Sequence, residues 1–242
     1  VPPELQRLGT LLFHGELSGY FNELVAYGVL RTDVGILQTD VKLSSNKAES
    51  YFAYSGLLKT VDFDLGRVLN NPKVGKISFN LEVEGNQYAH KYPFITLKGL
   101  ISSLCFSDYI YHDIALDGEY KQGGFNGNVS LDDENGTIVL DGAINTASRI
   151  PTFNFRADIR HFRPHNLHLT KHHEKSSISV NMEANFTGAS IDEMDGEISI
   201  DSLEILSSEK NYFLDHFIVS AARKNSQQKS LNITSNFIQA KI

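Results

Sequence analysis

The chain has 242 residues, of which 41% are hydrophobic and 21% charged, and its formal net charge is -7. This composition excludes a disordered tail, and the chain is long enough to bury a substantial core. No apolar run approaches the roughly 18 to 20 residues of a transmembrane helix. Nucleic-acid binders normally present a basic face, whereas here no Lys/Arg run exceeds two neighbours. Nucleic acid is therefore not an expected partner.

Two short helical turns are predicted in the first third of the chain. The first covers residues 2–9, where two prolines mark the start and Gly9 the end. The second covers residues 64–69, with Asp62 or Asp64 as its N-cap. The apolar residues of this turn are expected to lie on one side of the helix, namely Leu65, Val68 and Leu69.

The dominant signal in the rest of the chain is a strict alternation of apolar and polar residues. Successive side chains of a strand point to opposite faces of a sheet, so alternation predicts one apolar and one polar face. The apolar positions proposed to line a groove are Ile77, Phe79, Leu81, Val83, Ile138, Leu140, Phe153, Phe155, Ile178, Val180, Met182 and Phe186. Continuous apolar runs and intervening helices, which mark parallel sheets, do not occur, so the sheet is predicted to be antiparallel.

Turn signals separate these alternating segments. Residues 123–124, 132–136 and 224–226 are rich in Gly, Asn and Asp and are typical of hairpin connections. The sequence therefore predicts an all-β fold of roughly 15 strands in a single elongated domain over residues 1–242. Open sheets of more than about ten strands usually curl, flatten or split, so the meander could curl into a trough with its apolar face inward or split into a β-sandwich. The alternation alone does not choose between the two.

A short pattern, Gly-x-aliphatic-x-Thr, occurs at three places along the strands. It begins at Gly28, Gly56 and Gly142. Glycine within a strand marks a bend or bulge, which favours a weak structural repeat. The alternative is that Gly and Thr are simply common in β proteins.

Five histidines lie within thirteen residues and are candidate metal ligands, namely His161, His165, His168, His172 and His173. Imidazole binds zinc, copper and nickel well. However, the spacing matches no recognised metal motif, and Pro164 disfavours presentation on a helix. We therefore expect solvated loop histidines, with no metal and no other cofactor.

Catalytic signals are weak throughout the chain. The acidic segment 132–136 lacks the alternate-residue spacing of an EF-hand and is expected to be a hairpin tip rather than a calcium site. The sequence contains no tryptophan for a sugar platform and no Gly-x-Ser-x-Gly elbow. The single cysteine, Cys105, excludes an internal disulfide. The chain is expected not to be an enzyme.

Three stretches, residues 8–35, 63–85 and 184–215, together with residues 109–111 and 132–135, are similar in order and spacing to a known family. The chain resembles the TamB-like translocation and assembly module family in the form found in Bacteroidetes. That family is related to the AsmA-like proteins of Gram-negative bacteria. The resemblance extends over essentially the whole chain.

The resemblance implies an interior segment of a long periplasmic protein that is anchored in the inner membrane by a part absent from this chain. Alternation that continues through residues 231–242 agrees with an interior segment. The family fold implies a long sheet curled into a taco-like apolar groove, with the apolar positions named above as its lining. Such a groove would hold or conduct phospholipid and support outer-membrane biogenesis. The implied partners are phospholipid or another acyl-chain ligand, the outer-membrane assembly machinery and the inner membrane.

Two other functions remain open from the residues alone. An open sheet edge could template an unfolded outer-membrane strand by β-augmentation. A closed sandwich would instead fit a cell-surface carbohydrate-binding or adhesin module. Lipid specificity, transport direction and oligomeric state have no signal in the sequence.

Overall fold

The structure is a computed structural model, and it confirms the all-β prediction. It describes residues 6–20, 22–46, 51–88, 94–171, 175–190, 192–208, 210–223, 229–235 and 239–241. The chain divides into two compact units, residues 1–121 and 122–242. The prediction of one domain over residues 1–242 stays a prediction.

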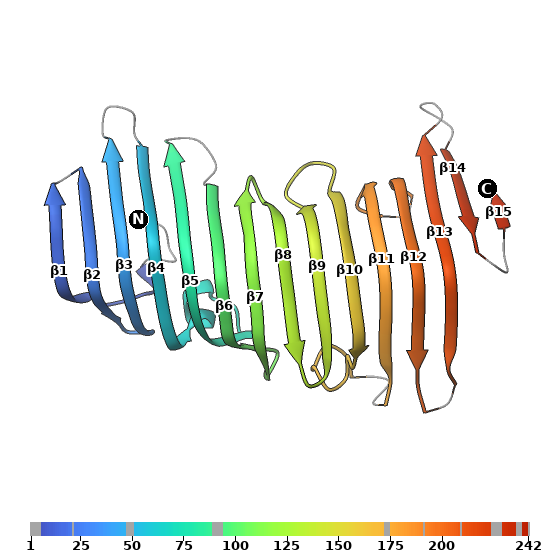
Figure 1. Cartoon of the computed structure of the whole chain (residues 1–242), viewed down its shortest axis with the longest axis horizontal. Coiled ribbons are helices and arrows are strands. Elements are labelled where there is room, and N and C mark those ends of the chain that lie inside the picture. Colours follow the sequence, from blue (N-terminus) through green and yellow to red (C-terminus); the bar gives the residue numbers. More distant parts are fainter. Residues whose placement is uncertain are drawn as a thin grey trace. The chain divides into compact units, whose positions relative to one another are not determined.

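Unit 1 is an antiparallel meander of seven described strands (Figure 1). They are β1 (Leu12–Tyr20), β2 (Glu23–Thr32), β3 (Gly35–Asn46), β4 (Tyr51–Asp64), β5 (Val74–Tyr88), β6 (Phe94–Phe106) and β7 (Tyr109–Lys121). Each strand pairs with its neighbours in sequence. The helix α2 (Leu65–Leu69) lies between β4 and β5. The predicted turn at residues 2–9 lies largely outside the described residues, although Gly9 has the positive φ of a stop, 73°.

Unit 2 is also an antiparallel meander. Its described strands are β8 (Gly124–Asp133), β9 (Gly136–Asn145), β10 (Thr152–Phe162), β11 (Ser177–Thr187), β12 (Asp195–Leu206), β13 (Tyr212–Arg223), β14 (Lys229–Thr234) and β15 (Gln239–Lys241). Again, the pairs join consecutive strands. The meander is therefore confirmed within each unit, and the β-sandwich alternative is wrong, because the strands form open sheet rather than two packed layers.

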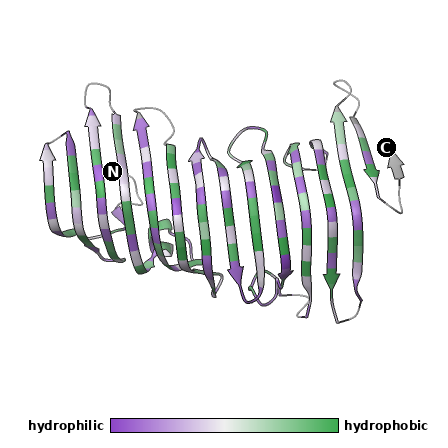
Figure 2. Ribbon diagram, in the orientation of Figure 1, coloured by the Kyte–Doolittle hydropathy of each residue, from purple (hydrophilic) through white to green (hydrophobic). Residues whose placement is uncertain are grey.

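The alternation seen in the sequence is the alternation of the two sheet faces. Figure 2 shows hydrophobic and hydrophilic residues following one another along the strands. In β5, for example, Leu81 and Val83 are buried while Glu82 and Glu84 are exposed. Antiparallel register places residues of like parity opposite each other, so each strand adds to the same apolar face. We call the two sides the apolar face and the hydrophilic face.

A bulge interrupts the alternation at the same point of both units. Thr60 and Phe63 of β4 pair with Phe79 and Ile77, so β4 carries one extra residue. In β10 the same shift falls between Ile159 and Phe162, which pairs with Ile178. An inserted residue reverses the parity of the residues after it, and this is why the even-numbered Thr60 and odd-numbered Phe63 lie on one face.

The details of the two bulges are equivalent. Asp62 and His161 both have positive φ, 55° and 48°. Their backbone N–H groups donate to serine Oγ atoms on the next strand, Asp62 to Ser78 at 3.0 Å and His161 to Ser179 at 3.1 Å. After each bulge, a backbone N–H group binds the turn of a preceding hairpin. Asp64 N–H donates to Val34 O at 2.8 Å in the β2–β3 turn, and Arg163 N–H donates to Asn135 O at 2.9 Å in the β8–β9 turn. The two units therefore share a structural repeat of about 100 residues.

This repeat differs from the one suggested by the Gly-x-aliphatic-x-Thr pattern. Gly56 and Gly142 both have positive φ, 146° and 138°, but Gly28 does not. Gly56 lies in β4, the counterpart of β10, whereas Gly142 lies in β9. Gly56 and Gly142 therefore mark similar local bends at positions that are not equivalent in the two units. The two units correspond in strand register and not in this short motif.

Gly142 should not tolerate a side chain. A Cβ atom there would lie 2.2 Å from Asn154 O and 2.5 Å from Phe155 Cα on the neighbouring strand. Because the contacts are with backbone and φ is positive, we expect Gly142→Ala to cost about 2 to 4 kcal/mol in urea unfolding. Gly124→Ala is the control, since its Cβ would meet chiefly the side chain of Asn145, which can move. Equal losses in the two variants would contradict this account.

Candidate functional site

The apolar face of unit 1 consists of cross-strand rows of small and aliphatic side chains. Register places in one row Thr39, Leu58, Leu81, Gly99 and Leu116. The next row contains Val41, Gly56, Val83, Leu97 and Gly118. The predicted residues of β5 thus lie together on one face, as the alternation indicated. Glycines beside large residues let side chains lie over neighbouring strands: a Cβ on Gly99 would be 3.2 Å from Leu81 Cδ2.

One end of this face is covered by helix α2 and the β2–β3 turn. Val34, Phe63 and Ile77 form a buried cluster, and the partly buried residues around it are Leu8, Leu37, Leu65, Val68, Phe79, Ile101 and Leu104. The N-cap is Asp64, one of the two residues predicted for that role, and its Oδ1 accepts from Arg67 N–H at 2.9 Å. The other, Asp62, lies in the bulge of β4. The sequence predicts that Leu69 shares the buried side, but Leu69 is exposed, because the single turn ends there.

Two arginines hold the helix in place. Arg67 Nη1 donates to Asp33 O at 3.1 Å in the β2–β3 turn. Arg7 Nη1 donates to Val68 O at 3.0 Å near the end of the helix. Cations bound at helix C-terminal carbonyls satisfy groups that otherwise lack an intrahelical partner. We call this helix and turn the end cap of unit 1.

The apolar face of unit 2 brings together the eight predicted residues of β9, β10 and β11. Register gives the rows Ile138, Ile159, Val180, Leu203, Leu214; Leu140, Ala157, Met182, Ile200, Phe217; and Phe155, Ala184, Ile198, Val219. Phe153 and Phe186 are opposite each other, with stacked rings 4.6 Å apart between centroids. Ile178 faces Phe162 beside the bulge. Ala157 and Ala184 are buried here but are not among the predicted lining residues, because small residues give a weak hydropathy signal.

The loop of residues 163–170 follows the bulge of unit 2, as α2 follows that of unit 1. Asn166 Nδ2 donates to Asn135 Oδ1 at 2.9 Å, which ties the loop to the β8–β9 hairpin. Leu167, in this loop, is 0% exposed. Its N–H donates to Arg163 O at 3.1 Å, so the loop makes one helix-like turn. The loop is therefore the counterpart of the end cap.

The hydrophilic face carries pairs of opposite charges, either on neighbouring strands or along one strand. Lys42 pairs with Glu23, and Lys98 Nζ lies 2.8 Å from Asp117 Oδ2. The hydrogen bond to Asp117 raises the pKa of Lys98. In unit 2 the hydrogen bonds from Arg160 lower the pKa of the Asp158 carboxyl. These pairs are exposed, and each contributes little to stability. Their charges keep this face hydrated.

Tyr54 lies on the apolar face of unit 1, toward the end opposite the end cap. It is opposite Gly85, and a Cβ on that glycine would lie 2.4 Å from Tyr54 Cζ. The tyrosine ring therefore covers the backbone of the next strand. Burial raises the pKa of the Tyr54 phenol. With Phe52 in the next row, Tyr54 gives this part of the face aromatic residues, and its polar tip is of the type found where apolar surface meets water.

The structure separates the predicted histidines. His161 is at the bulge of β10, whereas His165 and His168 are in the loop of residues 163–170. His172 and His173 lie outside the described residues. Among the described residues, no group of three or more His, Cys, Asp or Glu is placed to hold a metal ion.

Chelation tests the histidines directly. If they are loop residues, EDTA should leave the melting temperature unchanged, because no metal-binding free energy is coupled to folding. The measurement is thermal unfolding with EDTA, and then after adding zinc to the treated protein. A fall of many degrees with EDTA that zinc restores would show a metal site.

The acidic segment and the cysteine have structural positions. Residues 132–136 connect β8 to β9, as predicted, and Asn135 N–H donates to Asp133 Oδ1 at 2.9 Å across the turn. Cys105 is a half-buried thiol on β6, adjacent to Gly75 of β5. The predicted turn at residues 224–226 lies outside the described residues.

Comparison with known proteins finds no protein-family model, no curated protein and no solved structure that matches this chain. Among the described residues, the helices are too short or too polar to cross a lipid bilayer. The two faces of the sheet therefore provide the basis for assigning a function.

Proposed function

We propose that the chain is a periplasmic segment of an envelope bridge, similar to the TamB-like proteins, which holds or conducts phospholipid along its apolar faces. The observation that carries this proposal is the set of largely apolar cross-strand rows on one face of each unit. Soluble proteins rarely leave a large contiguous apolar surface without a ligand or partner that covers it.

The chemistry of an acyl chain suits such a face. Hydrocarbon tails make no hydrogen bonds, so binding needs only apolar contact, at about 0.8 kcal/mol per buried CH2. The rows are aliphatic and aromatic and carry few polar groups, so no fixed register is imposed on the chain. A ligand of this kind can slide along the face, and a carrier of this type needs no catalytic residue. The anchor and the outer-membrane assembly partners of the bridge belong to the same proposal.

Photo-crosslinking at adjacent residues of one strand tests the proposal. Phe155 is on the apolar face of β10 and is half-buried, whereas Asn154 is exposed on the hydrophilic face. A benzophenone amino acid at position 155 should crosslink phospholipid in bacterial cells, and the same group at position 154 should not. Mass spectrometry of the purified, irradiated protein gives the readout. Equal labelling at the two positions, or lipid at neither, would contradict the proposal.

A second candidate function rests on strand β1. Among the described strands it has one hydrogen-bonded neighbour, β2, and eight of its nine residues are exposed. An edge of this kind can add a strand from another chain. Hydrogen exchange of the β1 amides, measured with and without a peptide that copies one strand of an outer-membrane protein, would distinguish the two functions. β-augmentation predicts protection of β1 alone, whereas lipid binding predicts no change there.

A further inference from the structure

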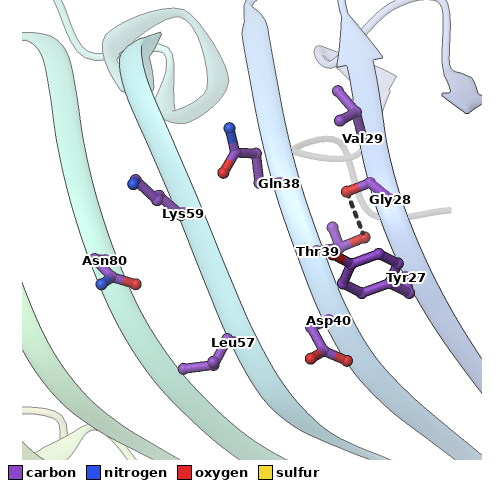
Figure 3. Close-up of a pocket in the computed structure, with 9 residues that line it drawn as sticks. All are labelled: Tyr27, Gly28, Val29, Gln38, Thr39, Asp40, Leu57, Lys59 and Asn80. Atoms are coloured by element: carbon purple, nitrogen blue, oxygen red, sulfur yellow. Dashed lines mark hydrogen bonds between the residues drawn. The ribbon is translucent and has the colours of Figure 1, made fainter. Parts of the chain in front are cut away.

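A hollow of about 370 Å³ opens on the hydrophilic face of unit 1, opposite the proposed lipid surface (Figure 3). It lies over β2 to β5. Register places Tyr27, Asp40 and Leu57 in one row across its floor. Gln38, Lys59 and Asn80 form the next row. A volume of this size falls within the usual range of small-molecule sites.

Among the polar side chains that line the hollow, Thr39 donates to the backbone O atoms of Ala26 and Gly28, each at 3.4 Å, whereas four others make no hydrogen bond or ion pair with the rest of the described protein. This holds for the amides of Gln38 and Asn80, the carboxylate of Asp40 and the ammonium of Lys59. Elsewhere on the same face of unit 1 opposite charges meet, as in Lys98 and Asp117. In Figure 3 the four side chains stand apart around the hollow. Their donors and acceptors are available to a ligand.

Two exposed apolar side chains lie among these polar groups. Tyr27 is 62% exposed and Leu57 is 51% exposed, one on each side of Asp40. A Tyr ring offers a flat apolar surface that loses water favourably when a ligand covers it. The hollow therefore combines a flat apolar platform with amide, carboxylate and ammonium groups.

These groups together select one chemical class. The single carboxylate and single ammonium cancel in formal charge, so a neutral ligand is favoured over a phosphate, which would meet Asp40. The backbone N–H and C=O groups of β2 to β5 are paired with neighbouring strands, so few of them are available to bind a peptide strand. Carboxylates accept from hydroxyls, amides both accept and donate, and an ammonium donates. A ligand with many hydroxyls and one apolar C–H face matches this set.

We propose that the hollow is a binding site for a neutral oligosaccharide, with one sugar ring stacked on Tyr27 and the hydroxyls of this and the following rings bonded to Asp40, Gln38 and Asn80. This site is on the opposite face from the lipid surface, so it adds a second ligand to the protein and does not depend on the first. A segment with both would contact lipid on one side and a glycan on the other.

Calorimetric titration of the purified chain tests the site. The probes are maltotriose and the trimer of β-1,4-linked N-acetylglucosamine, two neutral trisaccharides of different stereochemistry. We expect at least one to bind with a Kd between about 10 µM and a few millimolar. Tyr27→Ala and Asp40→Asn should each weaken it at least tenfold. Tyr20→Ala is the matched control, because Tyr20 is 82% exposed on β1 and is outside the hollow.

Both variants change exposed side chains, so their melting temperatures should stay near that of the parent chain. Failure of both trisaccharides to bind at 10 mM would overturn the proposal, and so would binding that Tyr27→Ala leaves unchanged. Glycerophosphoethanolamine serves as a charged probe. If it binds while the sugars do not, the hollow recognises a headgroup, and the saccharide assignment is wrong.

Discussion

Leu81→Asp is expected to lower the free energy of unfolding by roughly 3 to 5 kcal/mol, because it places an unpaired carboxylate in an apolar row. Leu81 is 7% exposed, between Leu58 of β4 and Gly99 of β6. Neither neighbour can donate a side-chain hydrogen bond. The measurement is urea unfolding at pH 7, followed by circular dichroism at a β-sheet wavelength.

The adjacent residue provides the control for this prediction. Glu82 is exposed on the hydrophilic face of the same strand, so Glu82→Ala should change stability by no more than about 0.5 kcal/mol. A sheet with one apolar and one hydrophilic face predicts that Leu81→Asp lowers the free energy of unfolding about sixfold more than Glu82→Ala does. If both variants lose the same free energy, the assignment of faces on β5 is wrong.

The effect of pH gives an independent check on Leu81→Asp. Burial raises the pKa of a carboxyl above its unfolded value. The folded variant therefore binds its proton more tightly than the unfolded chain, and its deficit relative to the parent chain grows as pH rises. The deficit should be smallest at low pH, where the carboxyl is neutral in both states. A deficit that stays constant across pH would contradict burial of the charge.

Leu167→Ala is expected to produce a loss of similar size in unit 2, about 2 to 5 kcal/mol, from the apolar contact removed and the cavity left behind. Leu167 is the largest fully buried side chain among the described residues, although it lies in a loop rather than a strand. If this loop is an end cap, removing its buried side chain should open it. Limited proteolysis would then cut near residues 163–170 faster than in the parent chain.

Leu169→Ala is the matched control, since it removes the same atoms two residues further along the loop. Leu169 is 48% exposed, so its loss should cost less than about 1 kcal/mol and leave proteolysis unchanged. Equal sensitivity of the two leucines would mean that Leu167 does not anchor the loop, and the equivalence with α2 would fail.

The proposed lipid surface could be predicted from the sequence to a large extent. Alternation alone assigns Ile77 and Leu81 in unit 1, and Val180 in unit 2, to the apolar side of their strands, and register places each on the apolar face of its own unit. Within a strand, the direction of a side chain depends on parity, which is a local property. The hollow with Tyr27 and Asp40 had no such signal, because Tyr27, Asp40 and Leu57 come from three strands that are adjacent only in the folded sheet.

The all-β fold, the antiparallel direction and the hairpin at residues 132–136 were determined by the sequence itself, since each follows from the conformational preferences of neighbouring residues. The sequence also limited the helix cap to Asp62 or Asp64, and the structure selects Asp64. Only the tertiary structure decided where the bulges fall, which ends of the apolar faces are capped and how the two units repeat each other. The extra residue at Asp62 or His161 becomes visible only through the partner strand, where Ser78 or Ser179 accepts its N–H. A bulge is a mismatch between two strands, so neither strand specifies it alone.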